Sequence, residues 1–101
     1  MSEPAVRLGA GELHLSGVLD YRSGPALRKQ GQALIKASNA PALILDCSEV
    51  EKSSSVGLSL LLAFMRDAKA AGKVVSVRSL PEDMRDIAQV SGLTELFDQH
   101  Q

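Results

Sequence analysis

The sequence predicts an α/β fold in which a small mixed sheet, built from an N-terminal hairpin and parallel strands, is packed with three or four helices. Two short apolar stretches, residues 6–8 and 12–16, flank Gly9-Ala10-Gly11, which is typical of a β-hairpin. From residue 42 onward, strand and helix patterns alternate, which indicates right-handed parallel crossovers. The 101 residues, 45% of them apolar, suit a single domain over residues 1–101.

The first half of the chain predicts the hairpin and one helix. In residues 12–16, Leu13 and Leu15 alternate with polar neighbours, so one face of this strand is expected to be buried. Residues 17–20 continue or end the strand. Pro25 suits the first helical position, because the N–H that it lacks has no partner there. The apolar spacing from Leu27 to Ile35 marks the inner face of this helix, and residues 39–41 end it.

The second half of the chain predicts two strands, and a helix follows each of them. Residues 42–45 are apolar without alternation, which predicts a central strand covered on both faces. A helix follows over residues 58–71 and ends near Gly72, and residues 74–77 form the next strand. A third helix begins at residues 80–83, has Met84, Ile87, Ala88 and Ser91 on its inner face, and ends at Gly92. Residues 93–97 are expected to form a last strand or helical turn.

Composition argues against several function classes. A formal net charge of −1 gives no electrostatic reason to expect nucleic acid or an anionic membrane as a partner. Aromatic residues are too few, at 3%, for a base-stacking surface. The N-terminus lacks the features of a signal peptide, and no apolar run approaches the ~20 residues that span a bilayer. We therefore expect a cytoplasmic protein with no direct membrane insertion.

Metal, cofactor and catalytic sites have little support in the sequence. His14 and His100 are the only histidines, Cys47 is most simply a structural thiol, and no phosphate-binding loop or nucleophile elbow occurs. Turn capping and solvation account for Asp20, Asp46 and Glu49. The prediction is a protein that is not an enzyme and uses no metal or cofactor. The alternative of a nucleophilic serine requires His14 within hydrogen-bond reach of Ser55.

Three consecutive serines, Ser53, Ser54 and Ser55, are the most informative feature of the chain. They lie between a predicted strand and a predicted helix, where backbone N–H groups and the positive end of the helix dipole are exposed. Ser54 or Ser55 could act as an N-cap and do nothing else. A single cap does not require three hydroxyls, so a binding role stays open beside the capping role.

The helix after the serines presents a polar stripe with one leucine in it. At 100° per residue, Ser55, Ser59, Leu62, Arg66 and Lys73 fall on one side. Such a stripe suits a protein-contact surface, although an ordinary solvated face with Leu62 turned toward its flank explains the pattern too. The predicted partner-binding residues are Ser53, Ser54, Ser55, Val56, Gly57, Ser59, Leu62 and Arg66.

Four motifs in order resemble those of STAS domains. The stretch LSGVLD at residues 15–20 resembles the end of the second STAS strand, and LILDCSEV at residues 43–50 resembles the third strand. The stretch SSVGL at residues 54–58 stands in the place of the STAS "Asp-Ser-Ser/Ala-Gly-Leu" loop. The stretch IAQVSGL at residues 87–93 resembles the end of the third helix. The resemblance covers nearly the whole chain and implies a STAS-like fold without catalysis.

Two branches of this family suggest different partners. In anti-sigma factor antagonists, a kinase phosphorylates the serine at the position of Ser55, and a phosphate there would change the contact surface. In MlaB-like STAS subunits of phospholipid-transport ABC systems, the domain docks on the ATPase subunit. Here Ser54 replaces the aspartate typical of the antagonists, Val56 replaces the second small residue, and the helix begins with LSLLL. The resemblance therefore favours an accessory subunit that binds an ABC transporter ATPase at the inner face of the inner membrane, with an antagonist phosphorylated on Ser55 as the alternative.

Overall fold

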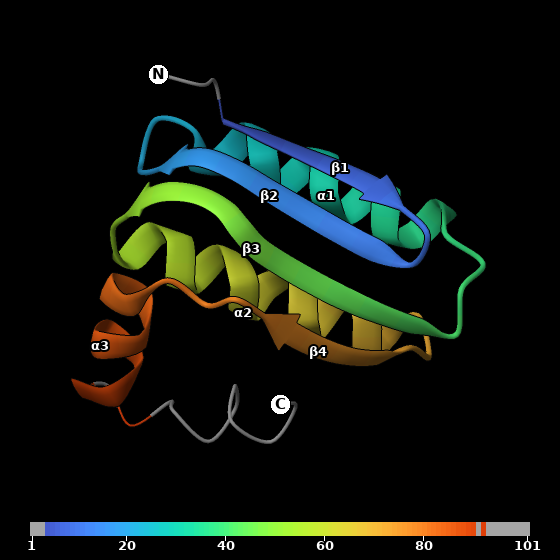
Figure 1. The fold of residues 1–101 in the computed structure, drawn as a ribbon. Coiled ribbons are helices and arrows are strands. Elements are labelled where there is room, and N and C mark those ends of the chain that lie inside the picture. The colour runs from blue at the N-terminus through green and yellow to red at the C-terminus, as the bar shows by residue number, and fades with distance from the viewer. Residues whose placement is uncertain (1–3, 91, 93–101) are drawn as a thin grey trace.

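A computed structural model describes residues 4–90 and residue 92 of the chain. The predicted roles of Ser91 and of residues 93–97 lie outside the described residues. The described elements follow the predicted order of strands and helices (Figure 1). Their bounds are β1 (Ala5–Gly9), β2 (Glu12–Leu19), α1 (Gly24–Ala37), β3 (Ala42–Ser53), α2 (Ser55–Ala70), β4 (Val74–Arg78) and α3 (Glu82–Val90).

The sheet is mixed, as predicted, with strand order β1-β2-β3-β4. The hairpin strands β1 and β2 pair antiparallel, whereas β2 with β3 and β3 with β4 pair parallel. Ala10 and Gly11 both take positive φ angles, 52° and 79°, in the tight turn between β1 and β2. The glycine-rich break therefore forms the hairpin that the sequence predicted.

Both long helices pack on one face of the sheet, which makes the molecule a two-layer structure (Figure 1). The prediction that residues 42–45 are covered on both faces is wrong. Leu43 and Leu45 point under the helices and are buried, whereas Ile44 lies on the opposite face and is only half-buried. Two-sided burial was inferred from the unbroken apolar run, but a single isoleucine beside polar neighbours can occupy the open face of a sheet.

The core lies between the sheet and the two helices and is centred on Phe64. This ring is fully buried beneath α1, and a Cβ built on Gly31 would lie only 2.3 Å from two of its atoms. Glycine at this position is what allows the backbone of α1 to approach the ring. This close packing holds α2 against α1 and so determines which side of α2 faces solvent.

Strand β3 is much longer than the sequence predicted, because it runs to Ser53. Its second half is polar, but it continues to pair with β2 up to the match of Leu19 with Ser53. Strand β4 pairs only with the part of β3 from Ala42 to Asp46. Helix α3 contacts β3 beyond that part, near Ser53. The extended strand carries the serine run to the far end of the sheet, beside the first turn of α3 (Figure 1).

Candidate functional site

The serine run forms the connection between β3 and α2, and each serine has a different environment. Ser53 ends the strand, Ser54 is the single connecting residue and Ser55 begins the helix. Ser54 is the N-cap, since its Oγ accepts a hydrogen bond from the Val56 N–H at 3.1 Å. Its own N–H donates to the carbonyl oxygen of Leu19 at 3.1 Å, which anchors the connection to the end of β2.

Ser53 and Gly57 pack closely together on the inner side of this connection. Ser53 is half-buried, and its Oγ donates to the Ser54 carbonyl oxygen at 2.9 Å. A Cβ built on Gly57 would lie 1.9 Å from the Ser53 Oγ and 3.2 Å from the Met84 Cε. Gly57 is buried and so offers no surface of its own, although it was predicted as a contact residue. Its lack of a side chain lets α2 start close to Ser53 and α3.

Ser55 is the exposed serine that has no internal task. Within residues 4–90 and 92, its side chain makes no hydrogen bond, because capping is done by Ser54. A solvent-facing hydroxyl at the first position of a helix is available to a partner or a modifying enzyme. The sequence left the choice of cap between Ser54 and Ser55 open, and the geometry resolves it in favour of Ser54.

The predicted stripe continues along α2 from Ser55 as far as Arg66. Ser59 and Arg66 are exposed, Leu62 is half-buried, and Val56 is half-buried at the edge of the stripe. The extension of the stripe to Lys73 is wrong. Helix α2 ends at Ala70, Gly72 turns the chain with a φ of 77°, and the buried Lys73 donates from Nζ to the carbonyl oxygens of Ser38 and Ala40.

A shallow apolar groove of about 340 Å³ lies next to the stripe, between the start of α1 and the first half of α2. Sequence reasoning missed its α1 side, which includes Tyr21 and Pro25 beside Val56, Ser59 and Ala63. Tyr21 is 75% exposed, so its ring is accessible at the edge of the groove. A ring in the turn before a helix was the available signal, and it becomes informative only once α1 is placed beside α2.

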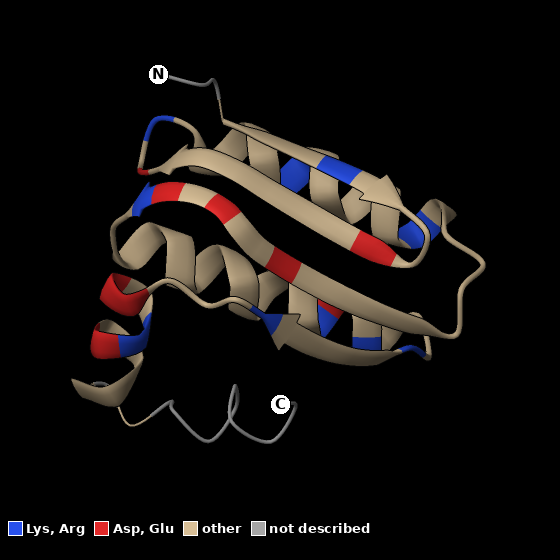
Figure 2. Cartoon of the chain, in the orientation of Figure 1, with Lys and Arg blue, Asp and Glu red and all other residues tan. Residues whose placement is uncertain are grey.

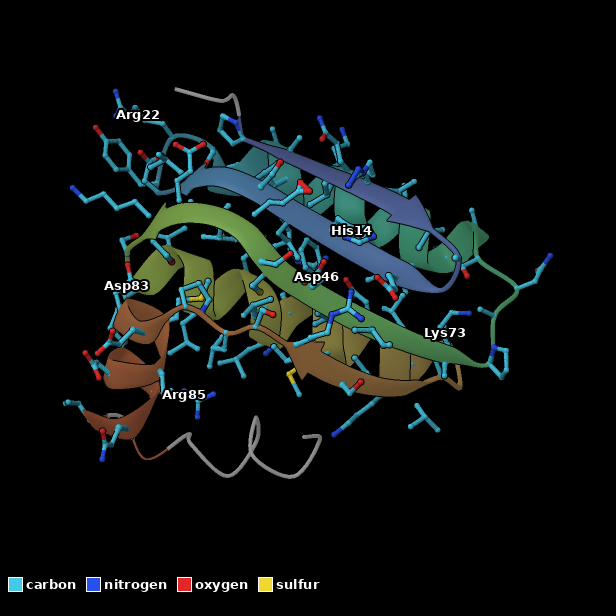
Figure 3. The ribbon with its side chains drawn as sticks, viewed as in Figure 1. His14, Arg22, Asp46, Lys73, Asp83 and Arg85 are labelled. Carbon is cyan, nitrogen blue, oxygen red and sulfur yellow. The ribbon has the colours of Figure 1, made fainter. Side chains whose placement is uncertain are left out.

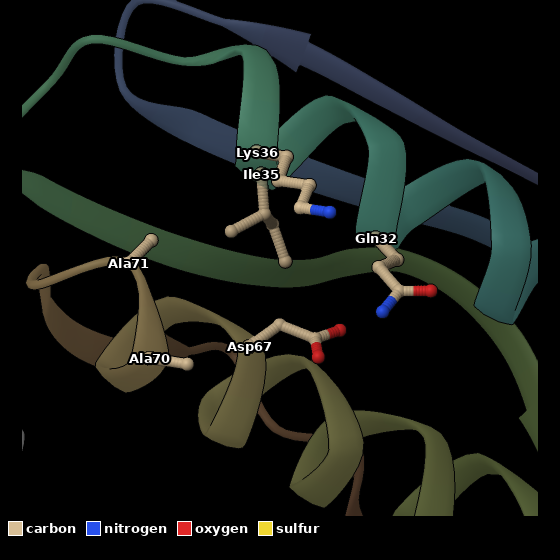
Figure 4. A pocket seen from close by; sticks show the side chains of 6 residues that line it. All are labelled: Gln32, Ile35, Lys36, Asp67, Ala70 and Ala71. Carbon is tan, nitrogen blue, oxygen red and sulfur yellow. The ribbon is translucent and has the colours of Figure 1, made fainter.

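A second depression, of about 150 Å³, lies between the far ends of α1 and α2 (Figure 4). It is lined by side chains such as Gln32, Lys36 and Asp67. The Asp67 carboxylate already accepts from both terminal nitrogens of the Arg28 guanidinium. This bidentate pair joins the two helices and leaves little in the depression for a ligand to neutralise.

The open face of the sheet carries a charged cluster that the sequence reasoning did not anticipate. The His14 Nδ1 lies 2.8 Å from the Asp46 Oδ2, and its Nε2 lies 3.4 Å from the Glu12 Oε1 (Figure 3). The Arg78 guanidinium donates to Glu12 and forms an ion pair with Asp46 at 3.3 Å. His14 and Asp46 were expected to be solvated separately, but the parallel register places them opposite each other.

The protonation of this cluster follows from its contacts. Burial raises the pKa of Asp46, but hydrogen bonds from Ser48, Arg78 and His14 outweigh burial and hold this pKa below its ordinary value. The hydrogen bond from Arg78 lowers the pKa of Glu12. Three potential metal ligands meet here, but the Arg78 guanidinium already provides the positive charge between the two carboxylates. The contacts therefore describe an ion-pair cluster and not a vacant metal centre.

His14 is distant from the serines, and the Cys47 thiol is inert. His14 pairs with Asp46, which lies seven residues before Ser53 on β3, or about 23 Å at ~3.3 Å per residue, so His14 is far from Ser55. The nucleophilic-serine alternative, which required His14 beside Ser55, is therefore wrong. Cys47 is buried, and burial raises the pKa of its thiol to about 12. Within the described residues, no helix is both long enough and apolar enough to cross a membrane.

Comparison with known proteins gives one family match and several similar structures. The family model described as "Mlab, STAS domain" matches residues 5–98. A chain of the Acinetobacter MlaFEDB complex in an ATP-bound conformation is 26% identical, with a TM-score of 0.79 over 92% of this chain and 96% of that one. An anti-sigma factor antagonist from Mycobacterium paratuberculosis is 30% identical, with a TM-score of 0.68 over 94% of this chain and 81% of that one. The unphosphorylated anti-sigma factor antagonist SpoIIAA, at 19% identity and a TM-score of 0.72 over 94% and 85% of the two chains, shares the fold.

Proposed function

Because the chain belongs to the STAS domain family and matches its Mlab-type model, we propose that it is a non-enzymatic accessory subunit of a phospholipid-transporting ABC transporter. In this role it binds the ATPase subunit and supports its activity, and the transporter maintains the lipid asymmetry of the outer membrane. The proposed contact surface is the connection at residues 53–56 together with Ser59, Leu62 and Arg66, and the buried Gly57 is not part of it. The protein then works in the cytoplasm, held at the inner face of the inner membrane by its partner.

One observation carries the proposal. Ser55 is exposed, makes no internal hydrogen bond within the described chain, and starts a stripe that continues through Ser59 and Leu62 to Arg66. The similarity to a chain of the MlaFEDB complex, which extends over 96% of that chain, supports a transporter subunit as the setting for this surface. The groove beside Tyr21 and Pro25 adds an apolar flank to it. Mixed apolar and polar surfaces of this kind suit protein association.

The proposal is tested by co-purification of the chain with the transporter ATPase subunit of the same organism. Ser55→Asp places a charged side chain at the centre of the surface and is expected to abolish co-purification, whereas Ser54 still caps the helix. Ser79→Asp is the matched control, because Ser79 is exposed, follows β4 and is not one of the proposed contact residues. Undiminished binding by Ser55→Asp would contradict the proposed surface, and no binding by the wild type would contradict the function.

A phosphorylation-controlled anti-sigma factor antagonist is the second candidate. It is favoured by the 30% identity to the mycobacterial antagonist and by the free hydroxyl of Ser55. Against it, Asp83 already places a carboxylate at the connection, by accepting from the Ser53 N–H at 3.1 Å, and a phosphate would add like charge there. Intact-mass analysis of protein isolated from its native cells, before and after phosphatase treatment, separates the two. A phosphate on Ser55 would support the antagonist.

A further inference from the structure

Acidic side chains are scarce on one layer of this protein, although the whole chain has a net charge of only −1. Helices α1 and α2 together carry five basic side chains and one acidic side chain, Asp67. That acid is already paired with Arg28. Most acidic residues lie on the sheet and on α3, as Figure 2 shows. The helical layer is therefore basic, a property that the net charge conceals.

One place on this layer combines basic charge with a hollow. A depression of about 250 Å³ on the outer side of α2 is lined by Leu62, Met65, Arg66 and Lys69. Arg66 and Lys69 are exposed, and neither forms an ion pair within residues 4–90 and 92. Leu62 is half-buried and gives the depression an apolar wall. Two unpaired cations therefore border a small apolar hollow.

We propose that this depression receives a segment of the ATPase subunit in which an apolar side chain is flanked by carboxylates. The inference rests on the proposed function and specifies the chemistry of the partner. Charge complementarity requires acidic groups opposite Arg66 and Lys69, and the apolar wall formed by Leu62 and Met65 receives the side chain between them. The depression shares Leu62 and Arg66 with the proposed contact surface, so one partner segment can follow α2 from Ser55 to Lys69.

A protein segment fits this site better than the other anionic macromolecules. Nucleic-acid surfaces usually add aromatic stacking platforms, but the depression contains no aromatic side chain. Anionic lipid would be attracted by the whole basic layer, including Lys29 and Lys36 on α1, and would not depend on this one hollow. Binding of the proposed protein segment should therefore require Arg66, Lys69 and Leu62 together, which distinguishes it from binding of anionic lipid.

The experiment measures the Kd between the full chain and the purified ATPase subunit at about 0.1 M and about 0.5 M NaCl. The double variant Arg66→Glu/Lys69→Glu is expected to weaken binding by about tenfold or more at low salt, with a smaller loss at high salt. Leu62→Ala is expected to weaken binding equally at both salt concentrations. The matched control is Lys29→Glu/Lys36→Glu, which makes the same charge change on α1 and should leave the Kd within about twofold. Circular dichroism verifies the fold of each variant.

The outcomes separate this inference from the function on which it rests. If the wild type does not bind the ATPase subunit, both the proposed function and this inference are overturned. If the wild type binds and Arg66→Glu/Lys69→Glu binds equally well, only the inference of an acidic partner segment is overturned. Equal losses from the α1 and α2 double variants would also overturn it, because a diffuse basic surface would then be sufficient. Co-sedimentation with phosphatidylglycerol vesicles is the last arm. Vesicle binding that requires Arg66 and Lys69 when ATPase binding does not would assign the depression to the membrane surface.

Discussion

Asp83 in the first turn of α3 accepts a hydrogen bond from the backbone N–H of Ser53, at 3.1 Å from the Asp83 Oδ2 (Figure 3). Its other oxygen accepts from the Met84 N–H at 2.9 Å. A residue thirty positions away in sequence thus holds the strand end that leads into the exposed Ser55. This carboxylate therefore couples the position of α3 to the conformation of the proposed contact surface.

Removal of this carboxylate should loosen the connection without unfolding the domain. For Asp83→Ala we expect a loss of about 1 kcal/mol in the free energy of unfolding, measured by urea denaturation. The Ser53 amide should also exchange with deuterium faster than in the wild type. Asp86→Ala, an exposed acid on the same helix, should change neither quantity appreciably. Unchanged exchange at Ser53 in Asp83→Ala would argue against the coupling.

The contact between Gly31 and Phe64 should not tolerate a methyl group. Because a Cβ at residue 31 would lie 2.3 Å from a ring that is fully buried, Gly31→Ala is expected to destabilise the fold by about 1–3 kcal/mol. Gly9→Ala makes the same substitution where nothing lies within 4 Å and should be close to neutral. In a Phe64→Leu background, Gly31→Ala should cost less stability than it does in the wild type. The cycle compares the wild type, Gly31→Ala, Phe64→Leu and the double variant. Thermal unfolding of the four proteins measures this coupling, and strict additivity would contradict it.

Acid should weaken the ion-pair cluster on the open face of the sheet. The pKa values of Asp46 and Glu12 are lower in the folded protein than in the unfolded chain, so the unfolded chain takes up protons first as the pH falls. Their contribution to stability is complete above the ordinary carboxyl pKa of about 4 and is lost as the pH falls through the lowered folded values. In Arg78→Met this acid-dependent loss should be smaller.

Urea midpoints measured between about pH 7 and about pH 3 provide the measurement. Arg7→Met is the control, because Arg7 pairs with the exposed Glu49 and does not touch Asp46. It should reproduce the wild-type dependence on pH. If Arg78→Met lost as much stability on acidification as the wild type, Arg78 would not contribute to the lowered pKa values of Glu12 and Asp46.

The Cys47 thiol should be unreactive in the folded protein. It is 1% exposed, and burial, together with the neighbouring Asp46 charge, raises its pKa to about 12, so almost no thiolate forms near neutral pH. A chromogenic disulfide reagent should therefore modify it only at the rate of unfolding, and rapidly in urea. Rapid modification of the native protein at pH 7 would show that this part of β3 opens far more often than its burial implies.

Local patterns in the sequence were sufficient for the order of elements and the type of sheet. The glycine-rich turn, the alternation of Leu13 and Leu15 and the acidic first turn of α3 all act over short distances, and the structure confirms them. The serine run was correctly placed at a helix start for the same reason. Ser55 and the stripe that it begins stay predictions as a binding site, since their exposure is compatible with such a site but does not demonstrate it.

The features that the sequence did not predict depend on packing between distant segments. The second half of β3 has few apolar residues, so only its pairing with β2 indicates that it is a strand. The meeting of His14 with Asp46 depends on register, and the groove beside Tyr21 depends on the distance between α1 and α2. The stripe was extended to Lys73 by helical periodicity alone, although the sequence already placed the end of the helix near Gly72, where the structure turns the chain.

The charged row across the open face also protects the alignment of the strands. Arg7, His14, Asp46 and Arg78 occupy matching positions on the four strands, in sequence from one edge of the sheet to the other. A slip of β3 by one residue would turn Asp46 toward the apolar helices and expose Leu45 to water. A misaligned form is therefore destabilised twice, because the Asp46 carboxylate is buried without its partners and the Leu45 side chain is exposed to water. Stacking two such faces together would also remove these charges from water, at a cost in free energy that opposes the association.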